Sequence, residues 1–156
     1  MCVDAKQLSQ RLATVGAFVK TGARVADIGS DHAYLPANLA LNHRISWGVA
    51  GEVVRGPFEN AHHEIQKLGL TDVLEARLAD GLAAIQPADR IDTVTIAGMG
   101  GPLIRRILEQ NPDRLDGVER LVPASYNHLT LPTIYPVSIA GFPSSSHNNI
   151  QHTYLS

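Results

Sequence analysis

The sequence contains a single cysteine, no long hydrophobic run and little net charge. The lone Cys2 cannot form a disulfide within the chain. No segment approaches the roughly 18 apolar residues of a membrane-spanning helix, and the first ten residues, MCVDAKQLSQ, lack the apolar core of a signal peptide. The net charge of −2 provides no general attraction to nucleic acid. These absences predict a cytoplasmic protein with no membrane partner.

Charged residues are also missing from one end of the chain. The 13 Lys and Arg and the 15 Asp and Glu all lie in residues 1–122, and residues 123–156 have none. With about a quarter of residues charged in ordinary proteins, such a gap arises by chance with a probability of roughly 10⁻⁴. We therefore predict one domain over residues 1–122 and a disordered or foreign tail over 123–156. A charge-free loop of a real domain is the alternative.

Within residues 1–122, helical and strand patterns alternate. Leu8, Leu12 and Val15 recur at helical spacing, with Asp4 or Ser9 near the start of that helix, and TVTIA (93–97) is typical of a buried strand. The pattern predicts helices over 7–19, 33–41, 57–68 and 102–110, and strands over 24–28, 45–53, 73–78 and 91–97, with a fifth strand starting at 120–122. This alternation indicates an α/β, Rossmann-like fold, in which a mostly parallel sheet has helices on both faces. Ligands of such sheets bind at the carboxyl ends of the strands.

The first predicted strand leads into VADIGSDHAYLP (25–36), which has too few glycines for a dinucleotide-binding loop. NAD requires G-x-G-x-x-G, because the backbone must approach the pyrophosphate, and here only Gly29 is present. Asp31 would repel a phosphate by about 4 kcal/mol at ~4 Å in a medium of effective dielectric near 20. No G-x-x-x-x-G-K-[ST] loop occurs either. An NAD-dependent oxidoreductase is therefore disfavoured.

The effect of the acidic residues is the opposite for a nucleoside ligand that carries positive charge. S-adenosyl-L-methionine carries a sulfonium and an ammonium group and no phosphate, so Asp27 and Asp31 would attract its methionine half. Gly29 would let the ligand approach the strand end, because no Cβ stands in the way. Glu52 ends the second strand and can accept from both ribose hydroxyls, and Asp80, after the third strand, can accept from the adenine amine. A carboxylate after each of three successive strands thus predicts S-adenosylmethionine as cofactor.

Each carboxylate also has a structural interpretation. Asp31 can cap a helix, Glu52 can be a solvated strand end, and Asp80-Gly81 is a common turn sequence. Asp27 is harder to explain in this way, because a carboxylate between apolar strand residues needs partners. The residues in this order, on this topology, are more informative than any one motif.

Five longer runs resemble the bacterial tRNA (adenine(22)-N1)-methyltransferase family: LSQRLATVGAFV, RVADIGSDHAYLP, AGEVVRGPFENA, ARLADGLAAI and DTVTIAGMGG. The resemblance covers about residues 8–122. It implies a class I methyltransferase fold, S-adenosyl-L-methionine as cofactor, tRNA as partner, no metal ion, and transfer of a methyl group to adenine N1.

The resemblance also implies where the cofactor lies. DIGSD (27–31) would surround its methionine moiety, Glu52 its ribose and Asp80 its adenine, while residues 98–100 would line the place where cofactor and target base meet. The predicted cofactor-binding residues are Asp27, Gly29, Ser30, Asp31, Glu52, Asp80, Gly81, Gly98, Met99 and Gly100.

Few residues are candidates for catalysis or for RNA binding. Asp31 is the candidate catalytic residue, as an electrostatic contributor near the transferred methyl group. No general base is predicted, because adenine N1 has an available lone pair. Arg11, Arg105 and Arg106 are the candidate contacts to RNA phosphate, with ordinary surface charges as the alternative.

The resemblance ends where the charges end. The family pattern would continue with a Gln-Pro-Asn turn, further strands and a helical C-terminal domain, but here Leu121-Val122 is followed by PASYNHLTLP. We therefore predict a truncated methyltransferase that is weakly active or inactive. A non-catalytic nucleotide-binding or interaction module is the second hypothesis.

Overall fold

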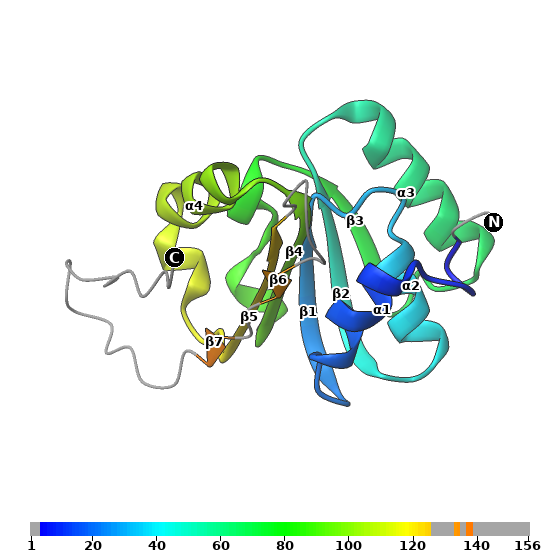
Figure 1. The fold of residues 1–156 in the computed structure, drawn as a ribbon. Helices are drawn as coiled ribbons and strands as arrows, with labels where there is room; N and C mark the ends of the chain where they lie inside the picture. The colour runs from blue at the N-terminus through cyan, green and yellow to red at the C-terminus, as the bar shows by residue number, and fades with distance from the viewer. Residues whose placement is uncertain (1–3, 126–132, 135–136, 139–156) are drawn as a thin grey trace.

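The computed structural model describes residues 4–125, 133–134 and 137–138 (Figure 1). The α-helices are α1 (Gln10–Ala17), α2 (Tyr34–Leu41), α3 (Arg55–Lys67) and α4 (Gly101–Gln110). The strands are β1 (Ala23–Ile28), β2 (Ile45–Glu52), β3 (Leu74–Leu78), β4 (Thr93–Met99), β5 (Arg120–Ser125), β6 (Thr133–Ile134) and β7 (Val137–Ser138). Short 3-10 helices lie at η1 (Gly81–Ala84), η2 (Pro87–Asp89) and η3 (Pro112–Leu115).

The strands form one sheet in the order β3-β2-β1-β4-β5-β6, with β7 also paired to β5. Neighbouring strands from β1 to β5 are parallel, whereas β6 and β7 run antiparallel to β5. The direction of winding reverses between β1 and β4, where Asp27 and Thr95 lie opposite each other in register. Such a switch point is where open α/β sheets bind ligands. The predicted parallel sheet is confirmed.

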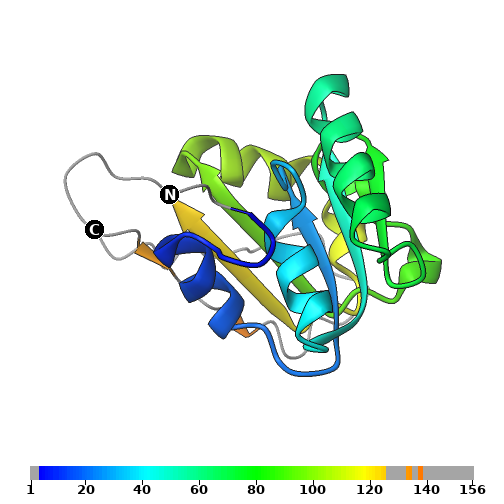
Figure 2. The same ribbon diagram turned by 90° about the vertical axis from the view of Figure 1, so that its right-hand side faces the viewer.

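Helices cover both faces of this sheet, as the alternating pattern predicted. Figure 2 looks onto the face covered by α1, α2 and α3, and α4 packs on the other face with the 3-10 helices. Leu35 and Leu39 of α2 are buried against the first face, and Ile104 and Ile107 of α4 against the second. Burial of one such side chain is worth about 2 kcal/mol, so these contacts fix the helices that flank the strand ends.

Arginine side chains secure the amino end of the sheet. The Arg44 guanidinium donates to the carbonyls of Gly16 (3.3 Å) and Val19, and Arg120 donates to the carbonyl of Phe18 at 2.8 Å. These carbonyls belong to the last turn of α1 and the residues after it, where a helix leaves acceptors without internal partners. These two arginines therefore contribute to the fold itself.

Helix boundaries differ from the prediction by a few residues. Ser9 caps α1, as predicted, by accepting a hydrogen bond from the Leu12 amide at 3.3 Å. α2 begins at Tyr34 because Ala33 has left-handed backbone angles, and α3 begins at Arg55, ahead of the predicted start at Pro57. No helix within the described part of the chain is long and apolar enough to cross a membrane.

β5 extends beyond the predicted domain boundary at residue 122. It runs parallel to β4 as far as Ser125, because β4 continues to Met99 and offers it pairing partners over that length. Two further short strands within residues 123–156, β6 and β7, pair with β5. The rest of the predicted tail, residues 126–132, 135–136 and 139–156, lies outside the described residues.

Candidate functional site

A cavity of about 130 Å³ lies at the switch point, at the carboxyl ends of β1, β2 and β4. Four residues of the predicted cofactor set line it: Gly29, Asp80, Gly81 and Met99. The other lining residues are Ile28, Gly51, Val53, Ala79, Leu103, Arg106, Ile107 and Gln110. Of the four predicted carboxylates, Asp80 lines this cavity, and Asp27, Asp31 and Glu52 are not among its lining residues.

Gly29 makes the first sharp turn after β1. Its φ of +69° is in the left-handed region, and a Cβ built on it would lie only 2.1 Å from the Met99 Cε atom. The amides of Gly29 and Ser30 both donate to the Gly51 carbonyl, at 2.9 and 3.2 Å. A side chain at Gly29 would thus enter the cavity and displace Met99.

Asp27 is buried at the end of β1, with 3% of its surface exposed. The Thr95 hydroxyl donates to Oδ1 at 2.6 Å, and the Ser30 hydroxyl donates to Oδ2 at 2.7 Å. Burial raises the pKa of Asp27 from 3.8 to about 6, against the two hydrogen bonds, and the charge of Glu52 adds to the rise. Asp27 does not line the cavity, although Gly29, two residues further along the chain, does. The hydrogen bond between Ser30 and Asp27 holds the loop after β1 against the strand.

Glu52 is the second buried carboxylate at this edge. It ends β2 and accepts a hydrogen bond from the backbone amide of Asp31. Burial raises the pKa of Glu52, the Asp31 amide opposes that rise, and the charges of Asp31 and His32 act in opposite directions. The carboxylate holds the loop after β1, and its remaining lone pairs can accept further hydrogen bonds.

This loop contains three consecutive strained residues. Asp31, His32 and Ala33 have φ values of 43°, 61° and 58°, in the left-handed region. Each such residue costs roughly 1–2 kcal/mol, so the hydrogen bonds from the loop to β2 must hold it in place. Backbone strain of this kind gathers at ligand sites, where the surrounding structure maintains it.

The Asp31 side chain does not enter the cavity. It is 83% exposed, and its carboxylate lies 3.5 Å from His32 Nε2. The His32 ring stacks on Tyr34, with ring centroids 5.2 Å apart. The alternative role of Asp31 as a helix cap is wrong, because Ala33 occupies the cap position of α2 and no side chain bonds there. Asp31 acts in this structure through its backbone amide.

In the described part of the chain, the buried carboxylates Asp27 and Glu52 form no ion pair. Within the described residues, no Lys, Arg or His nitrogen lies within 4.0 Å of the carboxylate of Asp27 or Glu52. Asp89 is also buried, but it forms a bidentate pair with Arg77 at 2.5 and 2.8 Å. Nor do the described residues contain a group of three His, Cys, Asp or Glu that could hold a metal ion. Unpaired acidic groups favour a cationic ligand.

Apolar side chains surround the mouth of the cavity. Val53 and Leu103 line it, yet they are 63% and 45% exposed. Val54, the chain neighbour of Val53, and Leu78, the last residue of β3, are exposed as well. Most of the residues that line the cavity are apolar, and such a lining with a few polar groups suits a flat ring. The exposed carboxyl group of Asp80 lines the same cavity and can accept a hydrogen bond from the edge of that ring.

The remaining predicted residues lie around β4 and α4. Gly98 is exposed and has a φ of +79°. A Cβ on Gly98 would lie 3.3 Å from a guanidinium nitrogen of Arg11. Gly100 is the N-cap of α4. Arg106, predicted to contact RNA, lines the cavity together with Asp80. Arg105 forms an ion pair with Glu109 at 2.8 Å on the surface of α4.

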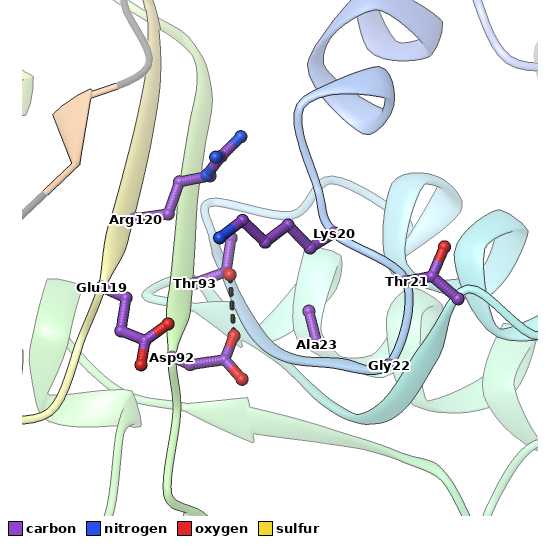
Figure 3. Close-up of a pocket in the computed structure, with 8 residues that line it drawn as sticks. All are labelled: Lys20, Thr21, Gly22, Ala23, Asp92, Thr93, Glu119 and Arg120. Carbon is purple, nitrogen blue, oxygen red and sulfur yellow. Dashed lines mark hydrogen bonds between the residues drawn. The ribbon is translucent and has the colours of Figure 1, made fainter.

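A second cavity, of about 160 Å³, lies at the amino end of the sheet (Figure 3). Figure 3 shows Lys20 reaching from the segment after α1 towards β4 and β5, with Asp92 and Glu119 beside it. Asp92 accepts hydrogen bonds from the Thr93 hydroxyl at 2.8 Å and from the Arg24 amide at 3.1 Å. The two cavities are similar in size, and both are lined by acidic and basic residues, but here the carboxylate of Asp92 is hydrogen-bonded to the fold.

Sequence reasoning missed the residues that depend on neighbours far along the chain. Thr95 was part of an apolar strand pattern, and only the register of β4 against β1 reveals that it faces Asp27. No sequence motif pointed to three further lining residues, Val53, Leu103 and Gln110. The orientation of α4 about its axis, which depends on its packing, places Arg106 at the cavity. A polar residue within the buried strand TVTIA was the one sign that could have found Thr95.

Fold and site together define a Rossmann-like domain of the class I methyltransferase type. A SAM-dependent methyltransferase from Thiobacillus denitrificans shares this fold at 21% identity, with a TM-score of 0.57. The chain belongs to the tRNA (adenine(22)-N(1))-methyltransferase family, whose model matches residues 25–130, so the match continues past residue 122.

Individual members of the family are closely similar to this chain. The tRNA (adenine(22)-N(1))-methyltransferase of Bacillus subtilis (strain 168) is 49% identical over 116 residues, which cover 74% of this chain and 48% of that protein. Streptococcus pneumoniae Sp1610, solved in complex with S-adenosyl-L-methionine, is 47% identical with a TM-score of 0.74, over 77% of this chain and 56% of that one. M. capricolum TrmK, solved with S-adenosyl-homocysteine, is 31% identical with a TM-score of 0.70, over 77% and 53%. The chain thus spans about half the length of the relatives it matches.

Proposed function

We propose that this chain is the cofactor-binding domain of an S-adenosyl-L-methionine-dependent enzyme that methylates adenine N1 in tRNA. The observation that carries the proposal is the pair of buried carboxylates, Asp27 and Glu52, at the switch point of the sheet without a cationic partner among the described residues. A buried carboxylate without a cation is costly to the fold, and a cationic ligand would offset that cost. The names and bound ligands of the family members identify the ligand class.

The cavity has the parts that such a cofactor needs. S-adenosyl-L-methionine would supply a methyl group on a positively charged sulfur. Gly29 leaves room for the ligand backbone beside β1, and Glu52 offers acceptor sites to ribose hydroxyls. Val53 and Leu103 supply apolar surface for the adenine ring, with Asp80 at the same cavity to accept from the amine. The residues present therefore fit this cofactor by charge, by shape and by hydrogen bonding.

Transfer to adenine N1 makes modest demands on the protein. N1 carries a lone pair and no proton, so the chain needs to orient the base but not to deprotonate it. The methylated ring gains positive charge, which the exposed carboxylate of Asp31 would stabilise at the edge of the site. A base that is paired through N1 must first be exposed. Such an enzyme would work in the cytoplasm, in keeping with a lone cysteine.

The test begins with the cofactor and continues with the acceptor. We expect isothermal titration calorimetry to detect binding of S-adenosyl-L-methionine, but not of NADH, to the purified chain. Radiolabelled methyl transfer is then measured with a tRNA transcript that has adenine at position 22 and with one that has guanine there, with weak incorporation expected in the first alone. A folded chain that binds NADH, or neither ligand, would overturn the proposal. Cofactor binding without methyl transfer would instead support a non-catalytic binding module.

A further inference from the structure

Two threonines of β4 face the same side of the sheet and are both buried. Thr93 is 3% exposed and Thr95 is 0% exposed. Each hydroxyl donates to an aspartate: Thr93 to its chain neighbour Asp92 at 2.8 Å, and Thr95 to Asp27 on the adjacent strand at 2.6 Å. The two bonds are similar in length, but Thr93 begins β4 and bonds the residue before the strand, whereas Thr95, two residues further on, bonds Asp27 at the carboxyl end of β1.

The Thr95 hydroxyl belongs to a chain of contacts that crosses the switch point. It bonds one oxygen of Asp27, and the Ser30 hydroxyl bonds the other. The Ser30 amide in turn donates to the Gly51 carbonyl at 3.2 Å. These bonds join β4, β1, the loop after β1, and β2. A change at β4 would therefore reach the strained loop through Asp27.

A hydroxyl at position 95 has no advantage for packing. Buried strands favour valine at such positions, and a hydroxyl buried without a partner costs roughly 1–3 kcal/mol. Thr95 avoids that cost because it bonds Asp27. Without it, Asp27 would keep a single side-chain donor, Ser30, and the carboxylate could rotate away from the loop.

We propose that Thr95 is a positioning residue of the cofactor site, whose hydroxyl orients Asp27 so that Ser30 and the loop after β1 stay in the conformation that accepts S-adenosyl-L-methionine. This inference rests on the proposed function. It concerns a residue that lines neither of the two cavities described above and that acts through Asp27.

The test compares the two threonines of β4. Thr95→Val removes the hydroxyl with little change in shape, and Thr93→Val does the same at the amino end. We expect Thr95→Val to raise the Kd for S-adenosyl-L-methionine at least about tenfold, as measured by calorimetry, because one charge-assisted hydrogen bond is lost. Thr93→Val should leave the Kd as in the wild type. Thr95→Ser, which keeps the hydroxyl, should restore most of the affinity.

A pH profile separates positioning from a general loss of packing. Among the described residues, Glu52 on β2 is the charged group that acts on Asp27, while Thr95 on β4 and Ser30 in the loop act by hydrogen bonds. Loss of the Thr95 bond raises the pKa of Asp27 further above about 6. The pH below which cofactor binding weakens should therefore move upward by about one pH unit in Thr95→Val, and not in Thr93→Val.

The outcomes distinguish this inference from the proposed function. A wild-type chain that does not bind S-adenosyl-L-methionine overturns the proposed function, and the inference with it. A wild-type chain that binds, with Thr95→Val equal to Thr93→Val in Kd and in pH midpoint, overturns the inference alone. If circular dichroism shows that Thr95→Val is unfolded, Ser30→Ala tests the same contacts from the loop. Its Kd should rise by a similar factor, and an unchanged Kd would refute the inference.

Discussion

At the amino end of the sheet Asp92, Arg44 and Arg120 are hydrogen-bonded to the backbone of the protein, whereas at the carboxyl end two carboxylates are buried with only hydroxyl and amide donors among the described residues. Asp92, at the amino end, accepts from the Arg24 amide and from Thr93. Asp27, at the carboxyl end, accepts from two hydroxyls, and its pKa is raised to about 6. The same strand, β4, supplies a threonine to each aspartate, so the difference lies in what surrounds each pair.

The glycines at the two ends of β1 also differ in their surroundings. Gly22 and Gly29 both have positive φ, at +84° and +69°. A Cβ on Gly22 would meet no atom of the described residues within 4 Å, whereas one on Gly29 would meet Met99 at 2.1 Å. The large apolar side chains that stay exposed in the described part, such as Val53 and Leu103, are also near the carboxyl end. On the proposed function, the carboxyl end gives up stability for ligand binding, whereas the contacts at the amino end contribute to the stability of the fold.

The largest expected effect comes from removing the cationic partner of a buried aspartate, Asp89, so that it has no ion pair, like Asp27. Arg77 bonds both oxygens of Asp89 and the carbonyl of Ala84. Arg77→Met would leave Asp89 buried without its bidentate cationic partner, with only the weaker influence of the Arg24 charge, and we expect it to lower the free energy of unfolding by about 3–5 kcal/mol at neutral pH in urea titrations. Arg55→Met, which removes an exposed pair with Glu59, is the control and should cost less than about 0.5 kcal/mol.

The pH dependence of this variant gives a second measure. Burial would raise the pKa of Asp89, but the Arg77 guanidinium and the Gln86 amide outweigh it and hold that pKa below its ordinary value. The stability from Asp89 is therefore present above its unfolded pKa and is lost as the pH falls through its folded value. In Arg77→Met the carboxyl group protonates at a higher pH, so the deficit should shrink between about pH 7 and pH 4. A constant deficit would contradict this account.

The second prediction compares the two glycines. Gly29→Ala should weaken binding of S-adenosyl-L-methionine at least ~100-fold, because the new methyl group and the displaced Met99 fill the cavity. Gly22→Ala should leave the affinity unchanged and cost about 1 kcal/mol of stability, from its positive φ alone. Calorimetry and thermal unfolding on both variants measure the two effects. Equal losses of affinity would mean that the site is not at the carboxyl end.

Sequence patterns predicted the elements of this contrast but not all of its contacts. The order of β1 to β5 and the place of Gly29 followed from periodicity and from one glycine after a buried strand, because those signals are local. Thr95 could not be assigned to Asp27, since the partner lies 68 residues away and depends on strand register. The left-handed angle of Ala33 was equally hidden, because alanine has no preference for it and the contacts of the loop impose it.

The third prediction neutralises the unpaired carboxylate. Asp27→Asn keeps the shape and can still accept from Thr95 and donate to Ser30. Because the folded pKa of about 6 lies above the ordinary 3.8, ionisation costs the folded state up to about 3 kcal/mol, a cost absent below pH ~3.8 and complete above pH ~6. We expect Asp27→Asn to raise the thermal midpoint by about 5 °C or more at pH 8 and by little at pH 4, while cofactor binding falls.

The control for that variant is Asp92, which directly precedes β4 at the amino end of the sheet. Asp92→Asn can accept from the Arg24 amide and donate to the Thr93 hydroxyl, but both hydrogen bonds lose the charge of the carboxylate, so stability should fall by about 1–2 kcal/mol at pH 8. Opposite signs for the two asparagine variants would support the contrast between the two ends of the sheet. A fall in stability for both would mean that the buried charge of Asp27 is already satisfied by its two hydroxyls.

The smallest expected effect concerns the apolar mouth of the cavity. Val53 and Val54 are neighbours after β2 with similar exposure, 63% and 58%, but only Val53 lines the cavity. If Val53 packs on the adenine ring, Val53→Ser removes apolar contact worth roughly 1 kcal/mol, which is about a fivefold rise in Kd. Val54→Ser loses the same atoms from solvent-exposed surface and should bind the cofactor as the wild type does. Because both side chains are mostly exposed, neither change should alter the thermal midpoint by more than about 2 °C, so a difference in Kd reports contact with the ligand and not the state of the fold.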